Sequence, residues 1–394
     1  MTEPDRAQPV LVGIVTAFIG FASSFAVVLA GLRAAGASEA EAASGLMAAA
    51  IAMGLAGVAL SVGLRQPVSG AWSTPGAALL ASTGAVAGGW PAAVGAFLVC
   101  AGLLIAAGLI KPFGRAVAAI PSTLANAMLA GVLFGLCLAP IKAILAAPLG
   151  AAAIIGVWLI VLRYRRAYAT PAAALAAALV IAHDAPALTL HASEIAPIPT
   201  PVWPAFTVEA FASIAAPLFI VTMASQNLPG VAVLKAYGYE PSPRTLIGVT
   251  GLFGALAAPF GGHAVNLSAI TAAMCASPDA SPDPGRRWIA SASCGAACVA
   301  LGLTAGAVTR FAAGAPLLVE AVAGLALLGA LGSALHNALA EPAQREAALA
   351  TFLVAASGVS FYGVGGAFWG LLAGGVVLAV TRAGASPPPP APPR

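Results

Sequence analysis

Two stretches that mix proline and glycine with polar residues decide the fold: PVSGAWSTPG at 67–76 and PFGGHAVN at 259–266. Each interrupts a long apolar region, and one lies in each half of the chain. When their first prolines are superposed, Thr74 coincides with Asn266, and both residue types are good helix N-caps. Each stretch is therefore predicted to be a short extended segment that leads into a half-helix.

The composition predicts a membrane protein. Of the 394 residues, 60% are hydrophobic and 8% are charged, whereas a soluble domain carries about a quarter charged residues. The apolar residues are spread along the whole chain, so we expect an all-α polytopic membrane protein whose partner is the lipid bilayer. The five cysteines lie in apolar surroundings and no P-loop is present. We therefore expect the cysteines to hold no metal and transport not to be driven by ATP. We also expect no cofactor and no nucleic-acid partner.

The apolar segments and the basic residues predict the topology. A spanning helix needs about 20 apolar residues, and the chain contains about 14 such segments, several of them short. Of the 17 Lys and Arg residues, only Arg33, Lys142 and Arg310 fall on the side predicted to lie outside. Because basic residues favour the cytoplasm, both termini are predicted to be cytoplasmic. The segments are 10–32, 40–63, 67–86 (broken), 91–110, 119–139, 146–162, 170–183, 209–234, 244–258, 259–277 (broken), 287–308, 315–337, 346–359 and 361–381.

The two halves of the chain also resemble each other. The first and eighth segments align without a gap, with ASSF at 22–25 facing ASQN at 224–227. The predicted topology places Arg33 outside and its counterpart Lys235 inside, so the halves have opposite orientation. We therefore predict two inverted repeats of seven spans, with short strands and half-helices in spans 3 and 10, an arrangement typical of secondary transporters.

The matched interruptions mark a candidate binding site, because non-helical backbone at membrane depth needs protein or a cavity to cover it. Each half-helix N-terminus offers unpaired N–H groups and about half a positive charge. No Asp or Glu lies in 10–32, 67–86 or 259–277, and the eighth segment has only Glu209, its first residue, so the site suits an anion such as a carboxylate. The candidate substrate-binding residues are Ser23, Ser24, Phe25, Trp72, Ser73, Thr74, Gly76, Gln226, Asn227, Gly262, His263 and Asn266.

Several candidates also have a purely structural interpretation. The two serines of the first span can bond their own helix backbone, and Phe25 and Trp72 either enclose an aromatic ring or pack in the core. Two adjacent amides, Gln226 and Asn227, are costly in lipid and need partners, which favours substrate contact.

Two titratable residues are candidates for carrying a coupling proton. His263 either bonds a carbonyl in the core, or donates to a carboxylate and takes the proton, since imidazole titrates near physiological pH. Glu320, beside the start of the twelfth span, is either an interfacial residue or a proton carrier. We favour His263 as the proton-coupling residue.

At these residues the chain resembles the benzoate/proton symporter family of the BenE type. Three stretches carry the resemblance: QPVSGAWSTPG at 66–76, ASQNLPG at 224–230 and APFGGHAVN at 258–266. That family is similar to the uracil-transporter architecture of seven plus seven inverted spans. The resemblance implies a bacterial inner-membrane symporter that imports benzoate or a related aromatic carboxylate with a proton, by an elevator-type movement.

The resemblance also implies a division into domains, and by family analogy alone a homodimer through the gate domain. A core domain would slide against a gate domain, with the substrate held between the short strands of spans 3 and 10. The implied boundaries are core 1–118 and 209–310, gate 119–185 and 311–383, a periplasmic loop at 186–208 and a disordered Pro-rich tail at 384–394.

One departure bears on the substrate. Nucleobase transporters of that architecture use acidic residues in the eighth and tenth spans, where this chain has amides and His263. The departure favours a carboxylate over a nucleobase and leaves the proton carrier open. A transporter or exchanger of another small anion on the same fold remains an alternative. An enzyme would need a nucleophile–base pair or a metal cluster at depth, and neither is found in the sequence, so we predict a transporter.

Overall fold

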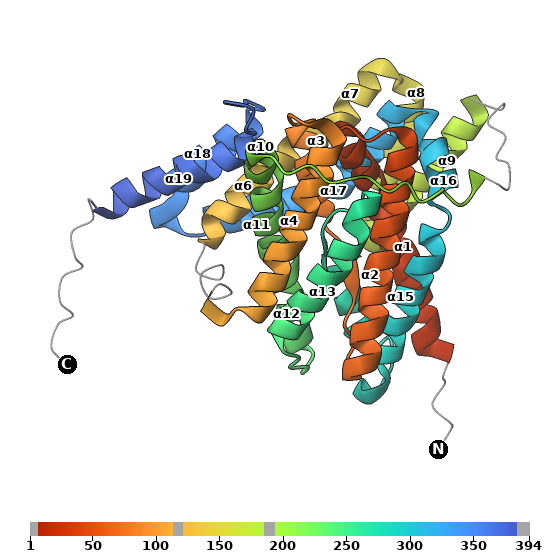
Figure 1. The fold of residues 1–394 in the computed structure, drawn as a ribbon. Helices are drawn as coiled ribbons and strands as arrows, with labels where there is room; N and C mark the ends of the chain where they lie inside the picture. The colour runs from red at the N-terminus through yellow and green to blue at the C-terminus, as the bar shows by residue number, and fades with distance from the viewer. Residues whose placement is uncertain (1–6, 113–120, 185–193, 384–394) are drawn as a thin grey trace.

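The computed structural model describes residues 7–112, 121–184 and 194–383, and these are mostly helical (Figure 1). The predicted tail at 384–394 and the predicted boundary at residue 118 lie outside the described residues. The elements of the first half are α1 (Ala7–Ala34), α2 (Glu39–Leu64), β1 (Gly70–Trp72), α3 (Thr74–Thr83), α4 (Gly89–Leu109), α6 (Ser122–Cys137), α7 (Ala139–Ala146), α8 (Pro148–Tyr164), η1 (Arg166–Tyr168) and α9 (Ala169–Asp184).

The second half begins with a helix that changes its winding along its length. Its elements are α10 (Val208–Ala210), η3 (Phe211–Ala215), α11 (Ala216–Thr222), η4 (Met223–Asn227), α12 (Leu228–Ala236), α13 (Pro243–Ala257), η5 (Ala258–Phe260), β2 (Val265–Leu267), α14 (Ala269–Ala276), η6 (Pro284–Arg286), α15 (Trp288–Gly302), α16 (Ala305–Ala313), α17 (Pro316–Leu339), η7 (Pro342–Gln344), α18 (Arg345–Ala356) and α19 (Gly366–Ala383). Of these, η3 and η4 are π-helical turns within one continuous span.

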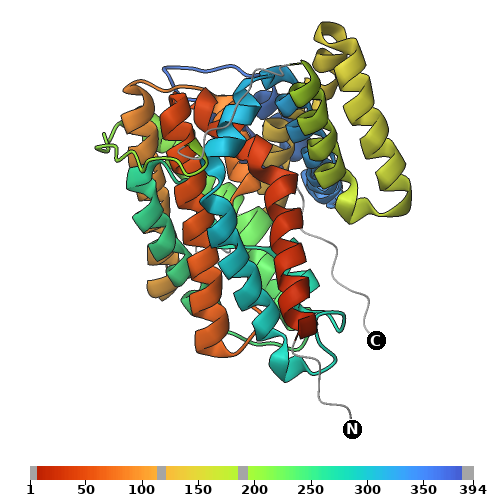
Figure 2. The same cartoon turned by 90° about the vertical axis from the view of Figure 1, so that its right-hand side faces the viewer.

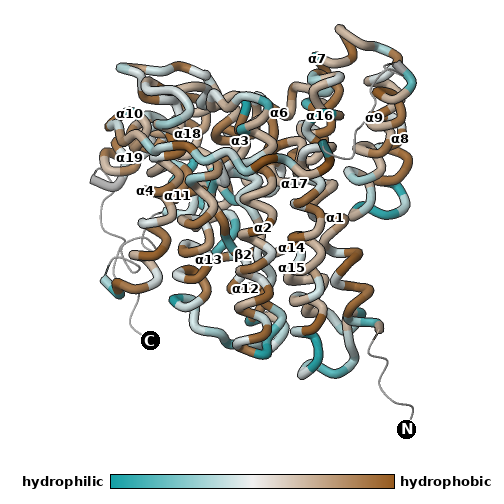
Figure 3. The backbone as a smooth tube through the Cα atoms, turned by 45° about the vertical axis from the view of Figure 1, so that its right-hand side comes forward, coloured by the Kyte–Doolittle hydropathy of each residue, from teal (hydrophilic) through white to brown (hydrophobic). Residues whose placement is uncertain are grey.

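The membrane class of the fold is confirmed. Among the described residues, six helices are long and apolar enough to cross a membrane, and a pair bent by 56° at 302–305 would make a seventh. The shorter apolar helices α8 and α19 add further candidates. Hydrophobic residues follow the helices and hydrophilic ones gather at their ends (Figure 3). Every predicted segment contains helical residues, and the count of about 14 crossings stays a prediction.

The two interrupted segments meet as a two-stranded antiparallel ladder. Beyond the strands themselves, Ser73 N donates to Ala264 O at 2.9 Å and Ser268 N donates to Ser69 O at 3.0 Å. The ladder therefore continues up to the N-cap residue of each half-helix, and the predicted short strands and half-helices are both present. The facing residues are Gly70 and Leu267, Ala71 and Asn266, and Trp72 and Val265.

The N-caps of the half-helices differ from the prediction. Ser73 caps α3 and Ser268 caps α14, each through its side-chain oxygen. Thr74 is instead the first residue of α3, and Asn266 is the central residue of β2. The prediction that Thr74 and Asn266 are the caps was wrong, because the backbone of Asn266 is held extended by its ladder partner and the helix cannot begin until the ladder ends.

The caps give the correct correspondence between the two interrupted segments. Superposing Ser73 on Ser268 also superposes β1 on β2, and it places Ala71 on Asn266. Ala71 and Asn266 face each other in the ladder, and two equivalent residues that pair with each other lie on a local two-fold axis. The segments are thus inverted relative to each other at this crossing, and the alignment on the first prolines was out of register.

Side chains of α2 satisfy much of the irregular backbone that leads to the ladder. Ser61 Oγ donates to Val68 O at 2.7 Å, and Ser44 Oγ donates to Phe260 O at 3.0 Å. The thioether of Met53 accepts from the Trp72 backbone N–H at 3.1 Å. Since no water reaches such groups in a bilayer core, these contacts explain how both breaks survive at membrane depth.

The helices form two bundles that lie side by side (Figures 1 and 2). In the first, which we name the core bundle (α1–α4 and α10–α16), α2 packs on α15 and α4 on α13. In the second, the gate bundle (α6–α9 and α17–α19), α17 packs on α6 and α18 on α19. The bundles touch where α1 contacts α17 and α9, and where α3 contacts α6.

The Pro-rich connection at 197–207 runs extended over the core bundle. Val202 N donates to Pro259 O at 2.7 Å, and Ala205 N donates to Pro91 O at 2.9 Å. The connection therefore ties the start of α4 to the end of the α13–η5 segment. Residues 185–193 of the predicted outer loop lie outside the described part of the chain.

The close approach of β1 to α2 depends on Gly70. A Cβ at this position would overlap the carbonyl oxygen of Met53 and lie 3.2 Å from the Gly57 nitrogen. Both neighbours are backbone, so Gly70→Ala should lower the free energy of unfolding by about 1–3 kcal/mol, read as a lower Tm in detergent. The matched control is Gly63→Ala on α2, where nothing lies within 4 Å of the added Cβ. An unchanged Tm in Gly70→Ala would contradict this packing.

Candidate functional site

The N-terminus of α3 is fixed by a cluster of small polar groups. Ser73 Oγ accepts from the Gly76 backbone N–H at 3.1 Å and from the Thr222 hydroxyl at 3.0 Å. Thr222 lies on α11, so this bond joins the third and eighth segments. A Cβ at Gly76 would overlap Leu218 Cδ1 and come within 2.7 Å of Ser73 Oγ. Gly76 thus allows both the cap and the contact with the eighth segment.

His263 bridges the two interrupted segments from within the core. It is 1% exposed, and its Nε2 lies 3.1 Å from the carbonyl oxygen of Ser73. Because a carbonyl only accepts, Nε2 carries the hydrogen and Nδ1 of the neutral ring is an acceptor. Nδ1 is buried and has no hydrogen-bond partner among the described residues. The neutral ring therefore cannot donate to a carboxylate through Nδ1, but Nδ1 can accept a proton.

The backbone around His263 is also tightly constrained. A Cβ at Gly262 would lie 2.6 Å from the Ala257 Cβ and 3.1 Å from the Ala49 backbone nitrogen. The imidazole packs edge-on to the ring of Phe97, with centroids 6.5 Å apart. Gly262 thus contributes space for the chain rather than a side-chain contact.

Asn227 ties the eighth segment to β2. Its Oδ1 accepts from the Leu267 backbone N–H at 3.0 Å, and its side chain is fully buried. Asn266 is equally buried, and its Nδ2 donates to Leu267 O at 2.9 Å. Its Oδ1 has no partner among the described residues. Asn227 therefore makes a structural hydrogen bond, and the Oδ1 of Asn266 is a buried acceptor in the centre of the ladder.

Gln226 and Thr74 are arranged differently from their neighbours. Both are only partly buried, and no hydrogen bond of either side chain is found in the described part of the structure. Gln226 lies in the π-helical turn η4, and such turns occur frequently at functional sites. These two side chains are therefore free to contact a solute.

The aromatic candidates form a connected row with Phe21. Trp72 Nε1 donates to Ser24 Oγ at 2.8 Å, so the indole is anchored on α1. The Phe21 ring lies 5.2 Å from the Trp72 ring and 6.1 Å from the Phe25 ring, centroid to centroid. Phe21 thus links Trp72 to Phe25, and Phe25 lies at the edge of the row that meets the gate bundle.

The serines of α1 both bond their own helix. Ser23 Oγ donates to Ile19 O at 2.5 Å, and Ser24 Oγ donates to Gly20 O at 2.9 Å. Ser24 has a second role because it also accepts from the indole of Trp72. The structural interpretation of the two serines therefore has direct support.

The electrostatics of the site come from peptide groups. The N-terminus of each half-helix is the end joined to the ladder, so both positive dipole ends face it. No Asp or Glu occurs in β1, α3, η4, β2 or α14. The described residues also contain no group of three or more His, Cys, Asp or Glu side chains that could hold a metal. The arrangement therefore favours a small anion held by N–H groups and neutral side chains.

Three residues that build the site were not among the candidates from the sequence. Thr222 lies one helical turn before Gln226, so the sequence places its hydroxyl on the same helix face as that amide. This spacing was a detectable signal. Ser268 precedes Thr271 by three residues, which is the spacing of a capping serine. Phe21 had no signal, because an aromatic residue in an apolar helix looks like ordinary core.

Comparison with known proteins shows the family and supports the fold. The family model described as "Benzoate membrane transport protein" matches residues 5–380. Inner membrane protein YdcO of Escherichia coli (strain K12) is 39% identical over 371 residues, covering 94% of this chain and 95% of that protein. The benzoate membrane transport protein of Acinetobacter baylyi (strain ATCC 33305 / BD413 / ADP1) is 32% identical over 327 residues, covering 79% of each.

A solved structure shares the fold over nearly the whole length. The transmembrane domain of the cyanobacterium bicarbonate transporter BicA superposes with a TM-score of 0.59 at 17% sequence identity, covering 98% of this chain and 99% of that one. The fold is therefore that of a transporter transmembrane domain, and the molecule is a multi-pass inner-membrane transport protein rather than an enzyme. The chain belongs to the BenE family of benzoate membrane transport proteins, which confirms the resemblance inferred from the sequence.

The two adjacent amides should respond differently to mutation. Asn227→Leu leaves the buried Leu267 N–H without its acceptor, so the free energy of unfolding should fall by about 1–3 kcal/mol. Gln226→Leu removes no observed bond, and its stability should stay within about 0.5 kcal/mol of wild type. Thermal unfolding of both variants in detergent measures the difference. Equal Tm values for the two variants would show that the Asn227–Leu267 bond contributes nothing.

Proposed function

We propose that this protein imports benzoate or a related aromatic carboxylate together with a proton. The observation that carries the proposal is the ladder with two half-helix N-termini facing it, in a region without Asp or Glu. A carboxylate is stabilised by such N–H groups and dipole ends. The relative from Acinetobacter baylyi, described as a benzoate membrane transport protein, supports the substrate class.

The polar contacts of the carboxylate are assigned to the groups that the fold leaves unused. Gln226 and Thr74 have no hydrogen bond in the described part of the structure and are partly buried, so their side chains are available as donors. The remaining candidates (Ser23, Ser24, Ser73, Gly76, Asn227, Gly262 and Asn266) shape the site, mostly through bonds to the protein itself. Phe25 and Trp72 supply the aromatic surface on which the ring of the substrate would pack.

The proton is assigned to Nδ1 of His263. This atom accepts a proton without breaking the bond from Nε2 to Ser73 O. The resulting imidazolium is costly to bury alone, and a carboxylate nearby offsets that cost. Anion and proton therefore favour each other's binding, which is the thermodynamic requirement for cotransport.

The transport cycle is assigned to a sliding of the core bundle against the gate bundle. In the proposed layout the core domain comprises 1–118 and 209–310, and the gate domain comprises 119–185 and 311–383. The ladder belongs wholly to the core bundle, so it would move as part of one rigid body. The basic residues support cytoplasmic termini, and a homodimer through the gate domain remains part of the proposal.

The same electrostatics would also accept another small anion. Helix N-termini recognise negative charge and not a particular acid, so the second candidate is a transporter or exchanger of another small anion. The aromatic row formed by Phe21, Phe25 and Trp72 favours benzoate over an inorganic ion.

Uptake into proteoliposomes tests the function. We expect labelled benzoate to accumulate under an inward proton gradient, and accumulation to stop when a protonophore is added. Unlabelled benzoate should compete well, while bicarbonate, sulfate and acetate should compete poorly, because they cannot use the aromatic row. Accumulation no higher than in protein-free liposomes would refute the substrate, and competition by all anions alike would favour the second candidate.

Two substitutions of His263 separate its roles. His263→Gln keeps an N–H donor for Ser73 O but cannot carry a proton, so benzoate exchange should continue while accumulation driven by the proton gradient is lost. His263→Ala removes the bond as well, and exchange should fall by roughly tenfold, as expected for a lost buried hydrogen bond of about 1.4 kcal/mol. Full gradient-driven accumulation in His263→Gln would exclude His263 as the proton carrier.

A further inference from the structure

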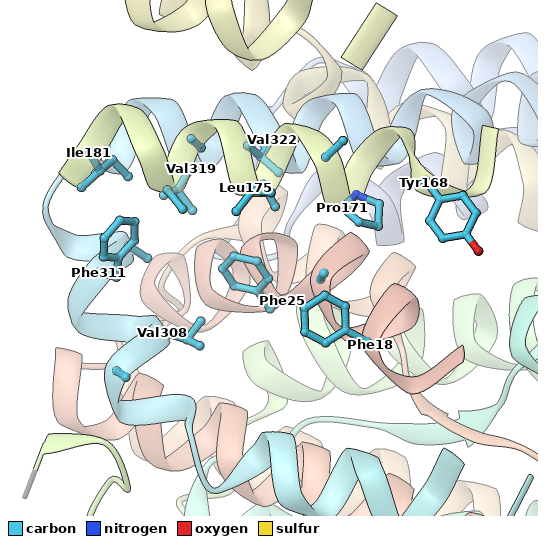
Figure 4. Close-up of a pocket in the computed structure, with 17 residues that line it drawn as sticks. Phe18, Phe25, Tyr168, Pro171, Leu175, Ile181, Val308, Phe311, Val319 and Val322 are labelled. Carbon is cyan, nitrogen blue, oxygen red and sulfur yellow. The ribbon is translucent and has the colours of Figure 1, made fainter. Parts of the chain in front are cut away.

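A groove runs along the boundary between the two bundles, separate from the ladder. One part of it, which we name the slot, is a cavity of about 550 Å³. The slot lies between α1 and α16 of the core bundle and α9 and α17 of the gate bundle. In Figure 4, Phe18 and Phe25 of α1 face Leu175 and Pro171 of α9 across this space. Every lining side chain is apolar except that of Tyr168. The slot therefore suits a hydrocarbon chain.

A second cavity, which borders the slot at Val319, carries charge. This cavity, which we name the mouth, has a volume of about 410 Å³ and is lined by Arg33, Glu39 and Glu320 together with small apolar residues. Val319 lines both cavities. Slot and mouth are therefore adjacent parts of one groove, apolar at one end and charged at the other.

The length of the groove matches one phospholipid. Its wall on α1 begins at Phe18 and ends at Ala34, which is roughly 24 Å at 1.5 Å per residue. One leaflet of a bilayer, including its headgroups, is about 20–22 Å thick. The apolar wall residues in between are Ala22, Phe25, Ala26 and Ala30, which lie on one face of the helix.

The groove is open to the membrane along its side. Phe18 is 61% exposed and Leu175 is 62% exposed, and both line the slot. Apolar side chains exposed on a membrane-spanning surface contact lipid. A lipid can therefore enter sideways, without passing through the substrate site.

The charges at the mouth select the headgroup. Nε and Nη2 of Arg33 donate to the Glu39 carboxylate at 2.8 and 2.7 Å, which leaves Nη1 for a further anion. Glu320 is exposed, and no ion pair of its carboxylate is found in the part of the chain that the structure describes. One cation and two carboxylates leave an excess negative charge. A head with a phosphate for Arg33 and a primary ammonium for Glu320 complements this set, and an anionic head does not.

We propose that the groove binds one phospholipid with a phosphoethanolamine head, with one of its two acyl chains in the slot and its head at the mouth. The walls belong to both bundles, so the lipid sits between two parts that the proposed transport cycle moves. The slot shares Phe25 with the proposed carboxylate site, but none of its lining residues belongs to the ladder. The ammonium donates hydrogen bonds to Glu320, which a trimethylated choline head cannot do.

Native mass spectrometry of the full-length protein in detergent tests this proposal. Phosphatidylethanolamine, phosphatidylcholine and phosphatidylglycerol with identical acyl chains are added at equal concentrations. We expect one tightly held lipid, with phosphatidylethanolamine preferred over each of the others by about fivefold, as for one partly exposed ion pair. Glu320→Gln should reduce the preference over phosphatidylcholine to about twofold or less.

Filling the slot from either wall should remove the bound lipid. Ala178 on α9 and Ala22 on α1 both line the slot, so a tryptophan at either position would fill it. Ala178→Trp is tested first, and Ala22→Trp is used if Ala178→Trp fails to fold. Leu159→Trp, at an exposed position on α8 outside the groove, is the matched control and should bind lipid as wild type does.

Two results would overturn the proposal. These are equal binding of the three lipids to wild type and retention of the bound lipid in folded slot-filled variants. A dimer that is present in wild type without lipid and is lost in Ala178→Trp would show instead that a second copy of the chain covers the groove. Because lipid binding is read without transport, failure here leaves the proposed function intact.

Discussion

The structure depends on a hydrogen-bonded ladder of two short strands inside a membrane protein. An unpaired backbone group in hydrocarbon costs several kcal/mol, and each interrupted segment leaves a run of such groups. The other interrupted segment supplies their partners, from Ser73 and Ala264 at one end to Ser268 and Ser69 at the other. Neither break is stable without its counterpart, so the two halves of the chain must fold together at this point.

The ladder explains why so many polar residues of the region bond to the protein itself. Asn227 accepts a hydrogen bond from the Leu267 N–H, and His263 donates one to the Ser73 carbonyl. The hydroxyl of Thr222 donates to the hydroxyl of Ser73. Each bond joins two segments that are distant in sequence. These residues fix the direction of the half-helix dipoles, and few side chains remain to touch a solute. A site of this kind recognises charge mainly through backbone geometry.

The sequence predicted the type of fold and the place of the site, but it did not predict the details of the contacts. Proline and glycine at 67–76 and 259–266 identified the interrupted segments because those residues disturb helices locally. The register of the ladder depends on pairing between distant strands, which no local pattern encodes. Thr74 and Asn266 were therefore assigned as caps in place of Ser73 and Ser268. The anchoring of Trp72 by Ser24 and the contact with Phe21 also depend on tertiary packing.

A site built from dipoles rather than fixed charges has a consequence for the energetics of import. An anion that enters a cell with a negative interior works against about 2.3 kcal/mol per 100 mV. A permanently charged lysine or arginine at the site would have to return empty as a cation, and that step would work against the membrane potential. The half-helices carry no net charge, so one proton on the loaded core is enough to cancel the charge of a carboxylate. In the proposed cycle both the loaded and the empty core bundle then cross without net charge, so the concentration gradients of proton and benzoate set the direction and the membrane potential does not.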